Sequence, residues 1–203
     1  MSSVFFTDFE VLVRRLQHTL MPLARELPEG VPGGQRIAAV LAPLYLRDGR
    51  PHLVFTRRAS TLKAHRGEIS FPGGSHDPAD ETLADTALRE AQEEIGLAPE
   101  RVTLLGTLEP VVTVVSNFTI VPFVGILPNG PGRLRPNPHE VDEIIDVPLA
   151  DLADPAIFHA EEWVRAGLPH KVYFFDYGTT RIWGATARML LSLLELLRQD
   201  NTP

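Results

Sequence analysis

Residues 71–97, FPGGSHDPADETLADTALREAQEEIGL, are the most informative stretch of this 203-residue chain. Over residues 80–95 the apolar side chains recur at helical spacing, which predicts an amphipathic helix. Glu90, Glu93 and Glu94 are spaced i, i+3 and i+4, so they share an arc of roughly 100° on that helix. The stretch therefore predicts a helix that presents three carboxylates on one side.

The other residues of this helix indicate which side could pack on a core and how far the charge of the three carboxylates is compensated. Leu83, Ala87, Ala91 and Ile95 lie on the neighbouring arc and can face a core. Arg89 is predicted to point to a different side, so it compensates the repulsion between the carboxylates only partly. Oxygen ligands suit Mg²⁺ or Mn²⁺, especially when a substrate adds phosphate oxygens. The cluster is therefore either a solvated acidic face or a divalent-cation site.

Glycines on both sides of the helix favour the cation site. Gly73 and Gly74 precede the helix, where a backbone carbonyl could approach a metal ion without side-chain obstruction. Gly96 follows the acidic pair and can end the helix tightly.

The stretch resembles the Nudix box, G-x5-E-x7-R-E-U-x-E-E-x-G-U, in which U is a bulky apolar residue. Glu81 is followed by seven residues and then by REAQEEIGL, residues 89–97, so every fixed position from Glu81 onward matches. A small alanine stands at the first U position. Six residues rather than five separate Gly74 from Glu81, so the role of the first acidic position is open between Glu81 and Asp80.

The resemblance implies a metal-dependent hydrolase for a diphosphate linked to another moiety. Glu90, Glu93 and Glu94 would hold Mg²⁺ or Mn²⁺, and the Gly74 carbonyl would be a further ligand. Arg89 would orient one of the glutamates. The metal would neutralise the diphosphate and lower the pKa of a water that attacks phosphorus in line.

The same resemblance implies a glutamate as general base. It could come from the box, as Glu93, or from a later loop, where Glu140 and Glu143 are the candidates. The sequence leaves these alternatives open.

A second signature lies before the box in residues 53–74, LVFTRRASTLKAHRGEISFPGG. It resembles the extended motif of Nudix proteins that act as coenzyme A pyrophosphatases, roughly L-L-T-x-R-S/A, a spacer and H-x-G-x-V-x-F-P-G-G. Residues 136–149 and 182–190 also resemble this subgroup. The matching residues in the motif are Thr56, Arg57, His65, Gly67, Phe71, Pro72, Gly73 and Gly74, with Ile69 in place of valine and Arg58-Ala59 where one small residue is usual.

This upstream segment is also cationic in an otherwise acidic chain. Arginine side chains suit phosphate oxygens because their fork of donors matches the geometry of phosphate. We therefore expect the segment to bind a substrate with several phosphates, although a solvated basic loop would have the same composition. The candidate substrate-binding residues are Arg57, Arg58, Lys63, His65 and Arg66.

The two resemblances together imply cleavage of the diphosphate bond of coenzyme A and its derivatives to 3′,5′-ADP and 4′-phosphopantetheine. One alternative is a Nudix pyrophosphatase for NADH, ADP-ribose or a nucleotide sugar. Another is a non-catalytic Nudix ligand-sensing domain, against which the intact box glutamates argue. Residues 111–123 either line a pocket for the pantetheine arm or form sheet core. The aromatic residues that either stack on adenine or pack in the core are Phe174, Phe175, Tyr177 and Trp183.

The whole chain is expected to form one domain over residues 1–203, with an N-terminal helical extension over residues 1–30, because its length and 44% hydrophobic content suit one core. Strand pairs with inserted helices predict an α/β fold, and the resemblance implies a Nudix-type α/β/α sandwich with a mixed β-sheet between helices. Pro43 predicts that the strand over residues 37–46 is an edge strand or carries a bulge.

Charge and composition limit the partners of the protein. A net charge of −7 disfavours non-specific binding to nucleic acid. The absence of cysteine excludes disulfides and thiolate chemistry. No signal peptide and no apolar run of about 18 residues is seen, so a cytoplasmic protein without a membrane partner is expected. The N-terminal helix could pack on its own domain or in a homodimer.

Overall fold

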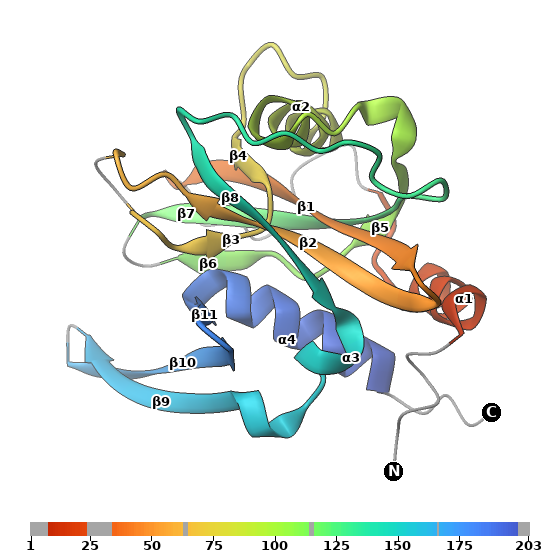
Figure 1. Cartoon of the computed structure of the whole chain (residues 1–203). Helices are drawn as coiled ribbons and strands as arrows, with labels where there is room; N and C mark the ends of the chain where they lie inside the picture. Colours follow the sequence, from red (N-terminus) through yellow and green to blue (C-terminus); the bar gives the residue numbers. More distant parts are fainter. Residues whose placement is uncertain (1–7, 24–33, 63–64, 114–115, 166, 199–203) are drawn as a thin grey trace.

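A mixed β-sheet forms the centre of the molecule (Figure 1). The structure is a computed structural model, and it describes residues 8–23, 34–62, 65–113, 116–165 and 167–198. The central sheet runs in the order β3-β2-β1-β7-β5, with β4 beside β1, β6 beside β7 and β8 beside β2. Its strands are β1 (Arg36–Arg47), β2 (Arg50–Arg58), β3 (Ile69–Ser70), β4 (Gly73–Ser75), β5 (Thr103–Thr107), β6 (Val111–Thr113), β7 (Phe118–Ile126) and β8 (Val141–Pro148).

Helices cover both faces of this sheet (Figure 1). Helix α2 (Leu83–Ile95) lies on one face, and α4 (Gly184–Arg198) lies on the other. The predicted α/β class, with a mixed sheet between helices, is therefore confirmed. In the part of the chain that the structure describes, none of the helices is long and apolar enough to cross a membrane.

The small sheet among the remaining elements extends the layer that contains α4. A three-stranded antiparallel sheet of β9 (Phe158–Arg165), β10 (Leu168–Tyr177) and β11 (Thr180–Trp183) packs beyond α4 (Figure 1). The short α3 (Leu149–Leu152) follows β8, and single 3₁₀ turns occur as η2 (Pro99–Arg101) and η3 (Pro155–Ile157).

The N-terminal helix α1 (Phe9–Thr19) packs on its own domain. Leu12 and Leu16 are buried in the same core as α4, and Arg15 Nε donates to the carbonyl of Leu196 at 3.1 Å. The predicted extension over residues 1–30 is thus helical over Phe9–Thr19, and residues 1–7 and 24–33 lie outside the described residues.

The prediction that Pro43 marks an edge strand or a bulge is wrong, since the register between β1 and β7 runs unbroken through Pro43. Strand β1 is interior, because it pairs with β7 along one side and with β4 and then β2 along the other. Pro43 falls between the segment that pairs with β4, residues 38–40, and the segment that pairs with β2, residues 44–47. The sheet tolerates the proline because it stands where β1 changes partner on that side.

Candidate active site

Helix α2 is bounded by the side chains and glycine that its sequence supplies. Thr82 is the N-cap, and it exchanges hydrogen bonds with Asp85 in a capping box. This cap places the helix start at Leu83, a little later than the spacing of apolar residues predicts. Gly96 ends the helix in the left-handed conformation with φ of 67°, as expected. The predicted core side, Leu83, Ala87, Ala91 and Ile95, is buried against the sheet.

The three glutamates of α2 differ steeply in burial. Glu94 is only 5% exposed, while the side chains of Glu90 and Glu93 are 18% and 52% exposed. Glu94 Oε2 accepts a hydrogen bond of 3.1 Å from the backbone N–H of Gly73. The helix face is therefore not a uniformly solvated acidic surface, since its last carboxylate is enclosed beneath β4.

The buried carboxylates are short of positive charge. The pKa of Glu94 is raised to about 8, chiefly by burial and in smaller part by the charges of Glu90 and Glu140, while the hydrogen bond from Gly73 and the charge of Arg58 oppose the shift. Burial also raises the pKa of Glu90, against the effect of Arg89. A cation bound among these groups would favour their ionised forms. The electrostatics therefore fit a metal site better than a structural acidic face.

Arg89 contacts two of the glutamates, contrary to the sequence prediction that it points elsewhere. Its Nη1 donates to Glu90 Oε1 at 3.0 Å and to Glu93 Oε2 at 3.1 Å. The long side chain reaches along the helix surface, so sequence adjacency to Glu90 does not separate the two groups. Arg89 thus holds both carboxylates in fixed orientations.

Asp80, not Glu81, anchors Arg89. Arg89 Nε and Nη2 each lie 3.0 Å from an Asp80 oxygen, and the Asp80 side chain is 8% exposed. The hydrogen bonds from Arg89 lower the pKa of Asp80 to about 2, despite its burial. Glu81 is exposed and forms no ion pair with any described residue. Five residues separate Gly74 from Asp80, so the regular box spacing counted from the glycine selects the residue that pairs.

Gly74 approaches the Glu90 carboxylate so closely that a side chain at this position would displace that carboxylate. A Cβ placed on Gly74 would lie 2.5 Å from the carboxylate carbon of Glu90. The preceding Gly73 has φ of 153° and abuts Ala39 in β1. A Cβ at Gly73 would therefore overlap backbone and one at Gly74 would move Glu90, and the Gly74 backbone stands beside the glutamates where the sequence predicts a carbonyl ligand.

The donor set fits a divalent ion that shares its coordination with a substrate. The candidate ligands are the carboxylates of Glu90, Glu93 and Glu94 and the carbonyl of Gly74. Among the described residues, no three acidic or histidine side chains are placed to hold a metal ion by themselves, so a substrate or water would have to complete the coordination. Mg²⁺ commonly uses one or two carboxylates together with substrate phosphates and water, which is the arrangement that this site can offer.

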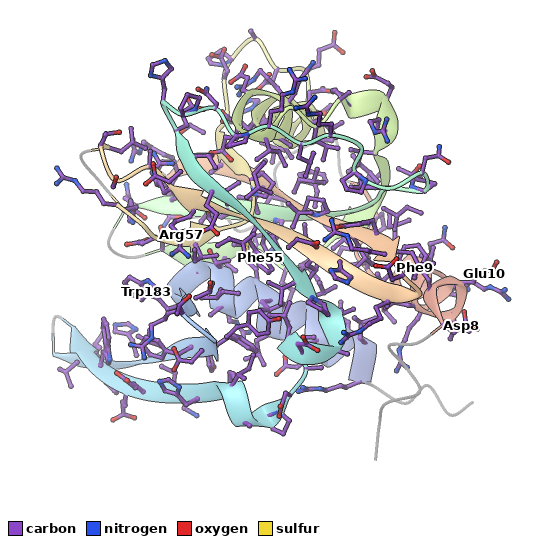
Figure 2. The ribbon with its side chains drawn as sticks, in the orientation of Figure 1. Asp8, Phe9, Glu10, Phe55, Arg57 and Trp183 are labelled. Carbon is purple, nitrogen blue, oxygen red and sulfur yellow. The ribbon has the colours of Figure 1, made fainter. Side chains whose placement is uncertain are left out.

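The two neighbouring arginines of β2 face opposite sides of the sheet. Leu53 and Phe55 belong to the core beneath α4, and Arg57 continues their side, where its Nε donates to Glu143 at 2.9 Å. Figure 2 shows Phe55 and Arg57 along β2 above Trp183. Arg58 lies on the other side and is close enough to lower the pKa of Glu94. Its buried Nε has no hydrogen-bond partner in the described part of the chain.

The other predicted substrate-binding residues lie in the loop after β2. His65 adopts φ of 58° and places Nδ1 2.9 Å from Glu68 Oε2. Arg66 Nε donates to the carbonyl of Leu62. Lys63 lies outside the described residues. Their assignment to substrate binding stays a prediction.

The two later candidates for the general base are placed differently. Glu140 is close enough to Glu90 and Glu94 to raise the pKa of both. Its carboxylate also accepts a long hydrogen bond of 3.4 Å from Asn137 Nδ2. Glu143 is turned to Arg57 on the opposite face. The geometry therefore favours Glu140 over Glu143 near the α2 carboxylates.

The aromatic residues considered for adenine stacking divide between two sides of the small sheet. Phe175 belongs to the core around α4, and Tyr177 donates to Asp151 Oδ2 at 3.2 Å. Phe174 and Trp183 stack on the other side with ring centroids 6.3 Å apart. Of residues 111–123, Val121 and Phe123 are buried in the core beside α2.

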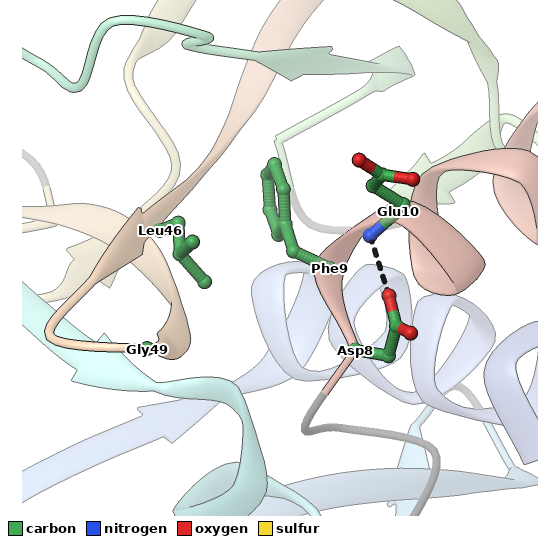
Figure 3. Close-up of a pocket in the computed structure, with 5 residues that line it drawn as sticks. All are labelled: Asp8, Phe9, Glu10, Leu46 and Gly49. Atoms are coloured by element: carbon green, nitrogen blue, oxygen red, sulfur yellow. Dashed lines mark hydrogen bonds between the residues drawn. The ribbon is translucent and has the colours of Figure 1, made fainter.

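A separate pocket lies beside α1, away from the box glutamates (Figure 3). It has a volume of about 580 Å³ and is lined by Asp8, Phe9, Glu10, Leu46 and Gly49. Asp8 caps α1 by accepting from the backbone N–H of Glu10 at 3.0 Å. The described residues of the lining offer two carboxylates and no cationic side chain, which does not suit a diphosphate.

Comparison with known proteins places these features in a family context. The protein-family model described as the NUDIX domain matches residues 35–167 of this chain. A Nudix hydrolase NudL of Photorhabdus laumondii is 38% identical over 192 residues, which is 95% of this chain and 97% of that protein. A NudL of Salmonella paratyphi B is 40% identical and covers 93% of this chain and 91% of its own length.

A solved structure supports the fold. The NUDIX hydrolase from Alicyclobacillus acidocaldarius superposes with a TM-score of 0.51 at 22% identity, over 59% of this chain and 81% of that one. At this identity the likeness concerns the fold alone.

Proposed function

Because the chain belongs to the Nudix family of hydrolases, we propose that it cleaves the diphosphate bond of coenzyme A and its derivatives. The products would be 3′,5′-ADP and 4′-phosphopantetheine, or the acylated form of the latter. Hydrolases of this family generally use divalent metal ions. Here Mg²⁺ or Mn²⁺ would be held by Glu90, Glu93 and Glu94 with the carbonyl of Gly74.

The observation that carries this proposal is the pairing of a buried carboxylate cluster with an unsatisfied arginine. The Glu94 carboxylate accepts a hydrogen bond from the backbone N–H of Gly73. Arg58 is close enough to lower the pKa of Glu94, and the buried Nε of Arg58 has no hydrogen-bond partner among the described residues. A diphosphate with its metal would supply acceptors for Arg58 and positive charge for Glu94 at once. The resemblance of residues 53–74 to the coenzyme A subgroup supports the substrate.

The roles of the residues follow from their positions. A bound divalent ion would neutralise diphosphate charge and lower the pKa of the attacking water. Arg58 would bind phosphate oxygens, and Arg89 would keep Glu90 and Glu93 in place. Glu140 or Glu93 would accept the proton of the water as it attacks phosphorus, and the P–O bond to the leaving phosphate would break.

A substrate panel tests the proposed specificity. With Mg²⁺ or Mn²⁺, we expect coenzyme A to be hydrolysed faster than dephospho-coenzyme A, NADH and ADP-ribose, because the cationic segment offers contacts to the 3′-phosphate. Phosphate-containing products of each reaction would be separated and quantified by chromatography. Turnover of NADH or ADP-ribose without turnover of coenzyme A would reject the coenzyme A assignment and leave the family assignment intact.

Arg58 is expected to contribute more to turnover than Arg57. Replacing Arg58 with alanine should lower kcat/KM for coenzyme A by roughly 10- to 100-fold, because it removes a charge-assisted hydrogen bond to phosphate. Arg57→Ala should cost less, since this side chain is held by Glu143 on the opposite face. Steady-state kinetics would measure both variants.

A matched control removes an arginine far from the carboxylates. Arg181 pairs with Asp176 at 2.6 Å on the outer sheet, so Arg181→Ala should leave kcat/KM near the wild-type value. A larger loss in Arg57→Ala than in Arg58→Ala would show that the assignment of the two arginines is reversed.

A further inference from the structure

Thr86 occupies an unusual position inside α2. Its side chain is fully buried, and its hydroxyl oxygen lies 2.8 Å from Asp80 Oδ2 and 2.9 Å from His76 Nδ1. A threonine inside a helix often returns its hydroxyl to the carbonyl four residues earlier. Here that carbonyl, of Thr82, is 3.5 Å away, so the shorter bond runs out of the helix to Asp80.

The direction of each hydrogen bond follows from counting protons. An ionised carboxylate accepts only, so the single hydroxyl proton of Thr86 is donated to Asp80. The hydroxyl oxygen is then the acceptor for His76, which must carry its proton on Nδ1. The backbone N–H of His76 is itself bound to the carbonyl of Ile37 at 2.9 Å. His76, whose backbone is tied to β1, therefore donates to Thr86, and Thr86 in turn donates to Asp80.

Asp80 receives a second set of donors from the opposite side. Arg89 binds it through Nε and Nη2, and the same guanidinium holds Glu90 and Glu93 through Nη1. A rotation of the Asp80 carboxylate would therefore be transmitted to both glutamates. Thr86 holds Asp80 Oδ2 independently of Arg89, together with a longer bond of 3.3 Å from the backbone N–H of Asp77, and so opposes such a rotation.

We propose that Thr86 is a positioning residue whose hydroxyl fixes Asp80 and, through Arg89, sets the orientation of Glu90 and Glu93. The inference rests on the proposed metal-dependent hydrolysis at these glutamates. Some residues do not touch a metal ion but hydrogen-bond to its ligands and orient them. Removing such a residue commonly lowers metal affinity or activity by about 10- to 100-fold. No contact between Thr86 and the substrate is required.

The test compares Thr86→Val with Thr86→Ser. Valine keeps the shape of the side chain but removes the hydroxyl, so the affinity for Mn²⁺ should fall by about 10-fold or more. Serine keeps the hydroxyl and should restore an affinity close to that of the wild type. Mn²⁺ binding would be measured on the whole protein by electron paramagnetic resonance, and kcat with coenzyme A would be measured at saturating Mn²⁺.

A matched control removes a similar hydrogen bond elsewhere in the fold. Tyr45 is 2% exposed and donates to Asp146 Oδ2 at 2.8 Å, and Asp146 has no contact with Arg89. Tyr45→Phe should therefore lower the thermal unfolding temperature without changing Mn²⁺ affinity. A role of Thr86 that is only structural would make Thr86→Val behave like this control.

A second readout needs no metal. The Arg89 Nε–H should exchange with solvent faster in Thr86→Val than in the wild type, because Asp80 is less firmly held, and NMR of the guanidinium would record the rate. Thr86→Ala adds no new atoms and carries the same expectation if the valine variant fails to fold. In an Asp80→Asn background, Thr86→Val should add little further loss.

The outcomes separate the two proposals. Wild-type protein that neither binds Mn²⁺ nor hydrolyses a diphosphate would overturn the proposed function. Wild-type protein that does both, alongside a Thr86→Val variant with unchanged Mn²⁺ affinity and unchanged Arg89 exchange, would overturn the role of Thr86 alone.

Discussion

Replacing Glu94 with glutamine is expected to remove hydrolysis while leaving the fold intact. The substitution takes away a buried negative charge that the proposed site needs for a divalent ion, so kcat should fall by roughly 10²- to 10³-fold or more. The amide oxygen of glutamine can still accept from the N–H of Gly73, as Glu94 does at 3.1 Å. Initial rates with coenzyme A and Mg²⁺ would measure the loss.

The same variant should be at least as stable as the wild type without metal. Burial raises the pKa of Glu94 from 4.5 to about 8, so ionised Glu94 destabilises the metal-free fold. For an acid whose pKa is raised by folding, this penalty is absent below pH 4.5 and grows as the pH rises towards 8. In the presence of a chelator, the free energy of unfolding of Glu94→Gln should therefore exceed that of the wild type by more at pH 8 than at pH 5. Denaturant unfolding would measure this difference.

Two results would contradict this assignment. Full activity of Glu94→Gln with any diphosphate would show that Glu94 is not a metal ligand. A large loss of stability in chelator would show that Glu94 has a structural role that glutamine cannot replace. Arg181→Ala, which removes an exposed charge on the outer sheet, is a control for both measurements.

Replacing Gly74 with alanine is expected to lower kcat/KM about 10²-fold with little loss of stability. The new Cβ would overlap the Glu90 carboxylate, which is the end of a flexible side chain and can move aside. The displaced carboxylate would leave its position beside Gly74 and its bond to Arg89. A shift of about 1 Å in a catalytic group can cost about 10²-fold in rate, so kcat/KM should fall by that order.

Gly73 provides the contrast for this prediction. Its φ of 153° is unfavourable for alanine, and its Cβ would overlap the backbone carbonyl of Ala39, which cannot move without disturbing β1. We therefore expect Gly73→Ala to lower the unfolding temperature strongly and Gly74→Ala to lower it little. Thermal unfolding and kinetics on both variants would measure this, and an active Gly74→Ala variant would refute the close approach to Glu90.

Local sequence features predicted the helix that carries the site. The apolar spacing of α2 and Gly96 at its end both depend on residues close in the chain. The α/β class also followed from the order of elements. Pro43 does not reveal that β1 is interior, because whether a strand is central depends on pairing with segments far away in the sequence.

The sequence by itself determined that three carboxylates share one side of a helix and that a cationic segment precedes them, because helical periodicity and composition are local properties. Only the tertiary structure decided which carboxylate is buried, since the enclosure of Glu94 comes from packing α2 against β4. The tertiary structure also decided that Arg57 and Arg58 face opposite sides of the sheet, because successive residues of β2 alternate between two packed faces. Arg89 pairs with Asp80 rather than with Glu81 because of the way the loop between β4 and α2 folds back onto the helix.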